Sequence, residues 1–410
     1  MKFAPIRNAF RSELVFSAAF RVGGMMIGFG NNVLLAQWMS PQLLGASAAI
    51  VGLASYHQLF SQLNQDNNLI RLLRPAGVSA WAEIQRQQMA RVLRSLLGAV
   101  VFSLLAGLAY ELTWLQIGAA FLYFGATSSM PWWVLGVKGD YRPQYVTQFA
   151  QSAIVLLTVV LVRLSGLAPV AGIEIVMYGA AASLGCVGIY RFLGLGRSLE
   201  VIPGASRPPR IAPSYSLLLS GALITIYSAS DLLIVAKFCS QGDAGIYRVG
   251  AGLVGAVNGL WLVAQANVYP RLVGAGNEPD AWISTRGLGW WLIGAVGLLG
   301  LAIGCALAME MILGARYRGI LPVVAILALA KTFSFGHAFF GLRIYAAGRN
   351  REALYSHAVA ISVGIGSALL LLNRWGMYGV AVGFLLGEVA MMMTIVTTWL
   401  LLRAAALKRG

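Results

Sequence analysis

Three basic side chains lie inside long apolar stretches of this chain, where a charge needs a physical reason. Arg21, Arg248 and Lys331 each fall within, or just inside, an apolar segment of helix length. A Lys or Arg at the centre of a bilayer costs about 2.5 to 3.5 kcal/mol on insertion scales, so such residues tend to be functional or paired. Guanidinium groups bind phosphate oxygens bidentately. These residues therefore predict an electropositive interior that receives an anionic cargo.

Acidic residues inside the apolar stretches are scarcer than basic ones. Asp231 and Glu388 are the best placed, and we expect them to neutralise a cation or to carry a coupling proton. The alternative for Arg21 and Lys331 is a buried ion pair with one of these acids or with Glu310. Arg248 lies near the end of its stretch, so snorkelling or a structural pair is an equal alternative there.

Amide side chains follow helical spacing in several of the same stretches. Asn31, Asn258 and Gln148 are the amides that we expect to meet polar groups of a cargo, and interhelical hydrogen bonding is the alternative. His57 and His337 can titrate near neutral pH, although a single His in a span more often makes only a hydrogen bond. Together these stripes favour a wet interior.

The elements that position these residues are membrane-spanning helices. The chain has 410 residues, of which 59% are hydrophobic and 11% are charged. A span needs about 20 mostly apolar residues. We therefore predict an all-α polytopic membrane protein with about twelve transmembrane helices. The predicted spans cover 13–38, 43–64, 92–110, 115–136, 145–164, 171–193, 214–237, 246–268, 289–313, 319–343, 354–372 and 378–402.

The basic excess fixes an orientation. Most of the 30 Lys and Arg residues fall in alternate gaps between the predicted spans, in the set that includes both termini. The positive-inside rule then places both termini in the cytoplasm of a multi-pass protein. The net charge of +16 therefore needs no nucleic acid to explain it. The three cysteines have no metal-ligand spacing, and no nucleotide-binding or hydrolase motif is present, so we expect no cofactor, no metal and no catalytic residue.

A proline-rich segment divides the predicted spans into two sets of six. The sequence predicts an N-terminal bundle over 1–193, a cytoplasmic linker over 194–213 and a C-terminal bundle over 214–410. With an offset of 200 residues, Ser40 and Gly45 align with Ser240 and Gly245. Transporters are commonly built from such duplicated halves, with the substrate between them near the midplane of the membrane.

Motifs in both halves carry a family resemblance. The second half has Asp231-Leu-Leu-Ile-Val-Ala-Lys237-Phe followed by Ala244-Gly245-Ile246-Tyr247-Arg248, and the first half has Ser40-Pro41-Gln42-Leu43-Leu44-Gly45. This order resembles the polysaccharide transporter family of the MOP exporter superfamily, which contains the O-antigen flippases. Ala244 departs from the family pattern, where Val is usual, and Gly250 stands where Ala is frequent.

The resemblance implies a function that suits the basic interior. It implies two six-helix bundles around a central cavity in a bacterial inner membrane, and flipping of an undecaprenyl-diphosphate-linked oligosaccharide (an O-antigen or exopolysaccharide repeat unit) from the cytoplasmic to the periplasmic leaflet by alternating access. Expected partners are the lipid-linked oligosaccharide, membrane lipids, H⁺ or Na⁺ as coupling ion, and polysaccharide polymerase and chain-length proteins. Under this hypothesis Arg21, Lys331 and Arg248 hold the anionic headgroup.

Two other functions stay open. The first is a multidrug or organic-cation antiporter of the same superfamily, which would favour an acidic and aromatic cavity. The second is a polysaccharide polymerase or ligase, which would need a longer outward loop than any in this sequence. The predominance of basic over acidic residues inside the spans favours the flippase, a secondary transporter and not an enzyme.

Overall fold

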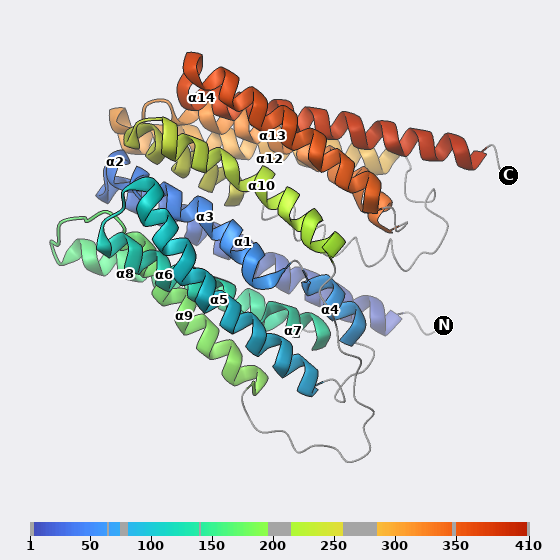
Figure 1. The fold of residues 1–410 in the computed structure, drawn as a ribbon, viewed down its shortest axis with the longest axis horizontal. Helices are drawn as coiled ribbons and strands as arrows, with labels where there is room; N and C mark the ends of the chain where they lie inside the picture. The colour runs from blue at the N-terminus through green and yellow to red at the C-terminus, as the bar shows by residue number, and fades with distance from the viewer. Residues whose placement is uncertain are drawn as a thin grey trace. The chain divides into compact units, whose positions relative to one another are not determined.

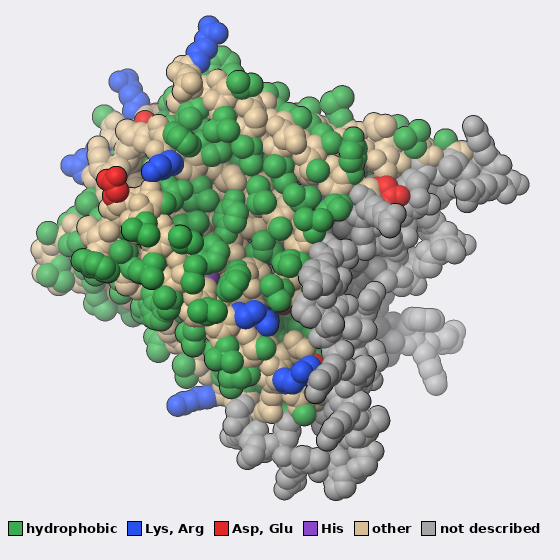
Figure 2. Space-filling model, in the orientation of Figure 1, with side chains coloured by type: hydrophobic (Ala, Val, Ile, Leu, Met, Phe, Trp, Pro, Cys, Tyr) green, Lys and Arg blue, Asp and Glu red, His purple; other side chains and the backbone are tan. Residues whose placement is uncertain are grey.

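The computed structural model describes residues 4–63, 65–73, 81–138, 141–195, 215–256, 285–346 and 350–407. Within them all regular secondary structure is helical, and eight helices are long and apolar enough to cross a membrane. Inside a bilayer every backbone amide and carbonyl needs a protein partner, which helices supply from their own chain. The protein is therefore an all-α polytopic membrane protein, as predicted (Figure 1). Much of the face drawn in Figure 2 consists of hydrophobic side chains, as contact with lipid requires.

Two compact units make up the fold. Unit 1 comprises Met1–Met39 and Ala46–Thr225, and unit 2 comprises Ser40–Gly45 and Ile226–Gly410. The boundary therefore lies within α10 (Tyr215–Phe238), and the short segment between the first two spans belongs to unit 2. The expected linker over 194–213 lies mostly outside the described residues, so the predicted division into bundles there stays a prediction.

Unit 1 is built, in the described chain, from eight helices and the first part of α10. The eight are α1 (Ala4–Trp38), α3 (Ala48–Gln62), α4 (Asp66–Leu73), α5 (Trp81–Tyr110), α6 (Trp114–Ser128), α7 (Trp132–Lys138), α8 (Arg142–Leu164) and α9 (Ile173–Leu193). Helix α1 packs on α8, and α5 packs on α3 and α6. Their apolar core includes Ile50, Phe124 and Ile175.

The predicted span over 115–136 is wrong as a single helix. The structure ends α6 at Ser128 and begins α7 at Trp132, with Pro131 between them. Proline has no amide hydrogen to continue the helical ladder and clashes with the preceding turn, so the helix breaks at this point. The break leaves the last carbonyls of α6 without helical donors, and side chains must supply them.

Unit 2 contains the remaining described helices. They are α2 (Pro41–Gly45), the rest of α10, a helix over 241–256, α12 (Thr285–Leu313), the short 3-10 helix η3 (Gly314–Tyr317), α13 (Ile320–Ala346) and α14 (Asn350–Leu407). Helix α13 packs on α12 and α14. A sharp kink at Gly376, with φ 53° and ψ −133°, separates the two predicted spans that make up α14.

The two arms of α14 fold back on each other through small residues. A Cβ atom added at Gly379 would overlap Leu371, one at Gly383 would overlap Ala368, and one at Gly387 would lie 2.9 Å from the Cα atom of Gly364. Glycines four residues apart form one face of a helix, and such faces allow close approach of helix backbones in membranes. This glycine face therefore holds the hairpin together.

A reciprocal close contact joins α2 to the helix over 241–256. An added Cβ atom at Gly45 would overlap the carbonyl of Gln241, and one at Gly245 would overlap the carbonyl of Pro41. These four positions are related by the same 200-residue offset that aligns the two halves of the sequence. The contact is therefore reciprocal between two segments that the predicted repeat aligns.

Candidate functional site

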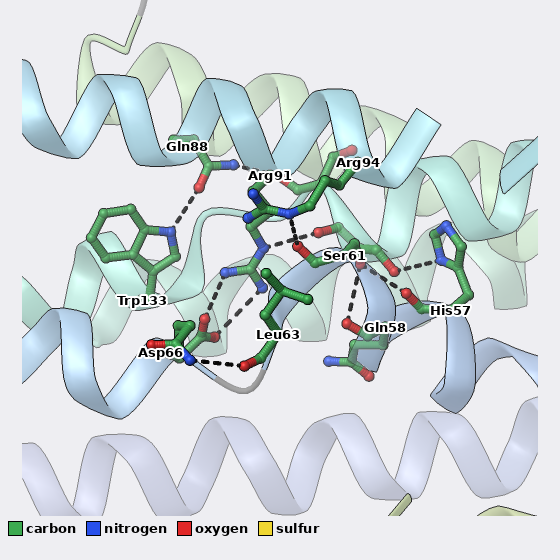
Figure 3. Close-up of polar contacts among 12 residues, drawn as sticks. His57, Gln58, Ser61, Leu63, Asp66, Gln88, Arg91, Arg94 and Trp133 are labelled. Carbon is green, nitrogen blue, oxygen red and sulfur yellow. Dashed lines mark hydrogen bonds and ion pairs between the residues drawn. The ribbon is translucent and has the colours of Figure 1, made fainter. Parts of the chain in front are cut away.

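Unit 1 contains a buried polar network around the break between α6 and α7 (Figure 3). Arg91 on α5 donates from Nε to the carbonyl of Ser128 at 3.1 Å, and its Nη1 lies 2.8 Å from Oδ1 of Asp66 on α4. Gln88 donates to the carbonyl of Ser129 at 2.8 Å and accepts from the indole of Trp133 at 2.7 Å. These side chains give hydrogen-bond donors to the carbonyls that the break at Pro131 leaves without helical donors.

His57 closes the same network on the α3 side. Its Nε2 lies 2.9 Å from the carbonyl of Ser95, which can only accept, so this nitrogen carries the proton. In the neutral ring Nδ1 then accepts from the hydroxyl of Ser128 at 2.8 Å. The His57 ring is buried and stacks on Phe124, with centroids 5.1 Å apart. Its contacts are those of a structural histidine.

Unit 2 contains the second polar cluster, and this one includes two of the predicted site residues, Lys331 and Glu388. Glu388 on α14 is buried, and each carboxylate oxygen faces one basic group of α13. Nζ of Lys331 lies 3.4 Å from Oε1, and Nε2 of His337 lies 2.9 Å from Oε2. The ion pair that the sequence left open for Lys331 is thus formed, with Glu388 as the acid.

Asp231 on α10 lies in the same unit but is held differently. Its Oδ2 accepts from the hydroxyl of Tyr247 at 3.0 Å, and its Oδ1 accepts from the amide of Leu232 at 2.7 Å. Among the described residues no Lys, Arg or His forms an ion pair with it, although the charge of Lys331 acts on it at longer range. Tyr247 is completely buried, whereas Asp231 is partly exposed. The side chain of Asp231 is therefore partly accessible, and its carboxyl group is held by neutral hydrogen-bond donors.

The other predicted residues are dispersed. Arg21 lies on α1, and its side chain is outside the described part. Asn258 is outside the described residues altogether. Asn31 is buried and donates to the carbonyl of Ser152 on α8 at 3.0 Å, and the hydroxyl of Ser152 bonds the carbonyl of Gln148. Asn31 thus joins α1 to α8 by a hydrogen bond, which matches the interhelical alternative to cargo binding. Gln148 lies on α8, one helical turn before Ser152.

Arg248 also has a structural partner. Its Nη1 donates to the carbonyl of Leu44 at the end of α2, at 2.8 Å, beside the reciprocal glycine contact. A peptide carbonyl at a helix end lacks a helical donor, so a guanidinium is a suitable partner. This placement matches the structural alternative that the sequence left open for Arg248.

Sequence reasoning missed the participants in unit 1. Arg91 was expected to be one of the loop charges that orient the protein, yet it is 3% exposed and lies inside the bundle. The signal was present: Gln88, Arg91 and Ser95 follow spacings of three and four and so share one helix face. Asp66 supplies the matching charge from a segment that was expected to be a loop.

The sequence itself matches no family model, and no curated protein is detectably similar to it. Solved structures do resemble it over nearly the whole chain. The lipid II flippase MurJ, in an inward closed conformation, aligns with a TM-score of 0.59 at 11% identity, covering 94% of this chain and 87% of MurJ.

Multidrug transporters resemble it equally. An inward-facing MATE family transporter of the MOP superfamily aligns with a TM-score of 0.59 at 13% identity, covering 96% of this chain and 99% of the other. The MATE multidrug transporter DinF-BH, solved in a complex, has the same TM-score at 14% identity, covering 95% of this chain and 94% of DinF-BH. At such identities the likeness establishes the fold alone, which this chain shares with the lipid II flippase MurJ and with MATE multidrug transporters.

Proposed function

We propose that this chain is a flippase that moves an undecaprenyl-diphosphate-linked oligosaccharide across the membrane by alternating access. The fold supports a transporter of this superfamily, since it is shared with a lipid II flippase and with multidrug transporters. The choice of cargo comes from the basic residues within the spans and from the family resemblance of the motifs around Asp231 and Tyr247.

The observation that carries the proposal is the contact between Lys331 and Glu388. A buried carboxylate that is paired with a cation keeps that cation away from other anions, because each charge compensates the other. Protonation of Glu388 would release Lys331 for a diphosphate, and binding of the diphosphate would favour the protonated acid. This exchange gives one way in which a coupling proton and an anionic cargo can be linked.

Arg21 is the residue proposed to hold the headgroup together with Lys331. A guanidinium on α1 offers two parallel donors to phosphate oxygens, which an ammonium cannot reproduce. Asp231 is proposed as a second coupling group, because no ion pair compensates its carboxyl group among the described residues.

The test compares variants at matched protein levels in cells that lack the chromosomal copy. Arg21→Ala, Glu388→Gln and Asp231→Asn are each expected to lower surface polysaccharide by at least about tenfold, since each removes a charge from the exchange. Arg21→Lys is expected to retain part of the activity. Full activity of Arg21→Ala would remove Arg21 from the mechanism, and full activity of Glu388→Gln would exclude the proposed exchange.

Export of an organic cation is the second candidate function. The partly exposed Asp231, without an ion pair in the described part of unit 2, could neutralise such a cargo, and several structural neighbours are multidrug transporters. Cells expressing the protein are expected not to export the cationic dye ethidium. Export that is lost in Asp231→Asn, with polysaccharide unchanged, would favour the exporter over the flippase.

A further inference from the structure

We propose that Arg94 and the apolar side chains beside it bind the phosphate group of an anionic membrane phospholipid. The site lies on the surface of unit 1, where α3 and α5 pack together. It is separate from the cluster of unit 2 and does not depend on the cargo proposed above. Charge compensation, the neighbouring apolar surface and the depth of Arg94 along α5 each support it.

Arg91 and Arg94 lie one helical turn apart, but only the charge of Arg91 is compensated by an acid. Arg91 is buried and paired with Asp66. Arg94 is partly exposed, and its Nε donates to the carbonyl of Ser61 at 3.1 Å. Within the described chain its terminal nitrogens have no hydrogen bond, and no acid pairs with it (Figure 3). Arg94 therefore presents an uncompensated positive charge, which the neighbouring Arg91 repels.

An apolar surface lies close to this charge. Gly98 lies one turn further along α5, and Phe60 of α3 covers it so closely that an added Cβ atom would lie 2.8 Å from the ring. Phe60 is 38% exposed, and Leu93 and Leu97 are each 61% exposed. Exposed apolar side chains thus occur close to Arg94 along α5 and on the neighbouring part of α3, as the glycerol backbone and upper acyl chains of a lipid would require.

The position of Arg94 along α5 indicates how deep it lies in the membrane. No charged residue occurs in α5 between Ser95 and the end of the helix at Tyr110. Helix α5 is long and apolar enough to cross a membrane, and only 28% of its apolar window is buried inside the protein. The rest of the window is exposed on unit 1. Arg94 therefore lies where the polar part of α5 gives way to its apolar part, which is the level of the phosphate groups in a bilayer.

The remaining donors suit a phosphate. Ser61 occupies Nε, so the two terminal nitrogens are left to bind two oxygens of one phosphate. Basic residues between transmembrane helices are a recurring way to bind anionic lipid headgroups. Simple snorkelling into water would give Arg94 no preference among lipids, so lipid selectivity is the property to measure.

The experiment measures lipid retention by the purified full-length protein in a non-ionic detergent. Phosphatidylglycerol or phosphatidylcholine is titrated in, and bound lipid is counted by native mass spectrometry. The wild type is expected to retain phosphatidylglycerol preferentially. Arg94→Gln is expected to weaken that binding by about tenfold, since one charge-assisted contact is lost. Arg94→Lys, which keeps the charge but not the paired donors, is expected to weaken it about threefold.

Arg86→Gln is the matched control. Arg86 lies on the same helix, and its side chain is 52% exposed and paired with Glu83. It is expected to bind phosphatidylglycerol as the wild type does. Unchanged binding by Arg94→Gln, or an equal loss in Arg86→Gln, would overturn the site. If Arg94→Gln does not fold, wild-type binding by Arg94→Lys would overturn it. Displacement of the lipid by millimolar inorganic phosphate would show a free-anion site and overturn the lipid assignment.

Discussion

The polar network of unit 1 and the charged cluster of unit 2 use ionisable residues differently. In unit 1 the charges lie around a helix break, and Arg91 is satisfied by Asp66 and by a carbonyl that the break at Pro131 leaves without a donor. In unit 2 the hairpin of α14 is held by glycines in close contact, and the charges lie beside that packing. A charged residue within a span is therefore not by itself a sign of transport. What matters is whether the helices need it to hold their structure.

The largest expected effect comes from the unit 1 network. Arg91→Ala is expected to lower the free energy of unfolding by about 3 to 5 kcal/mol, because it leaves Asp66 without its cation and the Ser128 carbonyl without a donor. Thermal unfolding in detergent measures the change. Arg94→Ala is the control, and a loss of about 1 kcal/mol or less is expected there. Equal losses in the two variants would contradict the structural role given to Arg91.

The next effect belongs to the glycine face of unit 2. Gly383→Ala is expected to cost about 1 to 3 kcal/mol, because its Cβ atom would overlap the backbone of Ala368, which cannot move aside as a side chain can. Gly366→Ala on the same helix is the control, since an added Cβ atom there meets nothing within 4 Å. Unfolding in detergent should separate the two. A stable Gly383→Ala variant would show that the hairpin is looser than described.

A pair of single hydrogen bonds tests the comparison directly. Trp133→Phe removes the donor to Gln88, and Tyr247→Phe removes the donor to Asp231. Tyr247→Phe is expected to cost about 1 kcal/mol of stability, and Trp133→Phe about 1 to 3 kcal/mol, since it also removes ring volume from a buried position. Only Tyr247→Phe is expected to change transport, because Asp231 is a proposed coupling group and Gln88 is not. A transport defect in Trp133→Phe, at matched protein levels, would give the polar network around the α6–α7 break a share in the mechanism.

The smallest effect concerns reactivity and leaves stability unchanged. Cys239, at the joint after α10, is partly buried, and burial together with the neighbouring Asp243 raises the pKa of its thiol to about 11. The thiolate is the reactive form, so alkylation of a variant with only this cysteine should be slow at pH 7 and accelerate with pH up to about 11. A rate that levels off at about pH 8.5 would show an ordinary exposed thiol, and therefore less burial of Cys239 after α10 than described.

Much of the fold could be predicted because the bilayer imposes one rule on every span. Long apolar stretches must be helical, so α8, α9, α10 and α12 lie within a few residues of their predicted ranges. The break at Pro131 was missed because its hydropathy is still that of a span. The turn at Gly376 was expected only as a short gap, since a single glycine with positive φ suffices to reverse the chain.

The site was predictable by residue type but not by partner. Asp231, Lys331 and Glu388 were identified because charges within spans are rare. That Glu388 would take both Lys331 and His337 depends on the packing of α13 against α14, which spacing along the chain does not contain. Arg91 was missed because it lies just before its predicted span, where a basic residue ordinarily reports orientation.

The contact of Gly45 with the segment that begins at Gln241 restricts which substitutions the two segments can accept during evolution. After a duplication, two copies of a segment are free to diverge in sequence wherever they meet different neighbours. Here each copy is the neighbour of the other, so a side chain gained at Gly45 or at Gly245 would strike the backbone of the opposite copy. Neither position can therefore gain a side chain without moving the backbone of the other segment, and homologues that have lost every other trace of the repeat should still carry glycine at both positions.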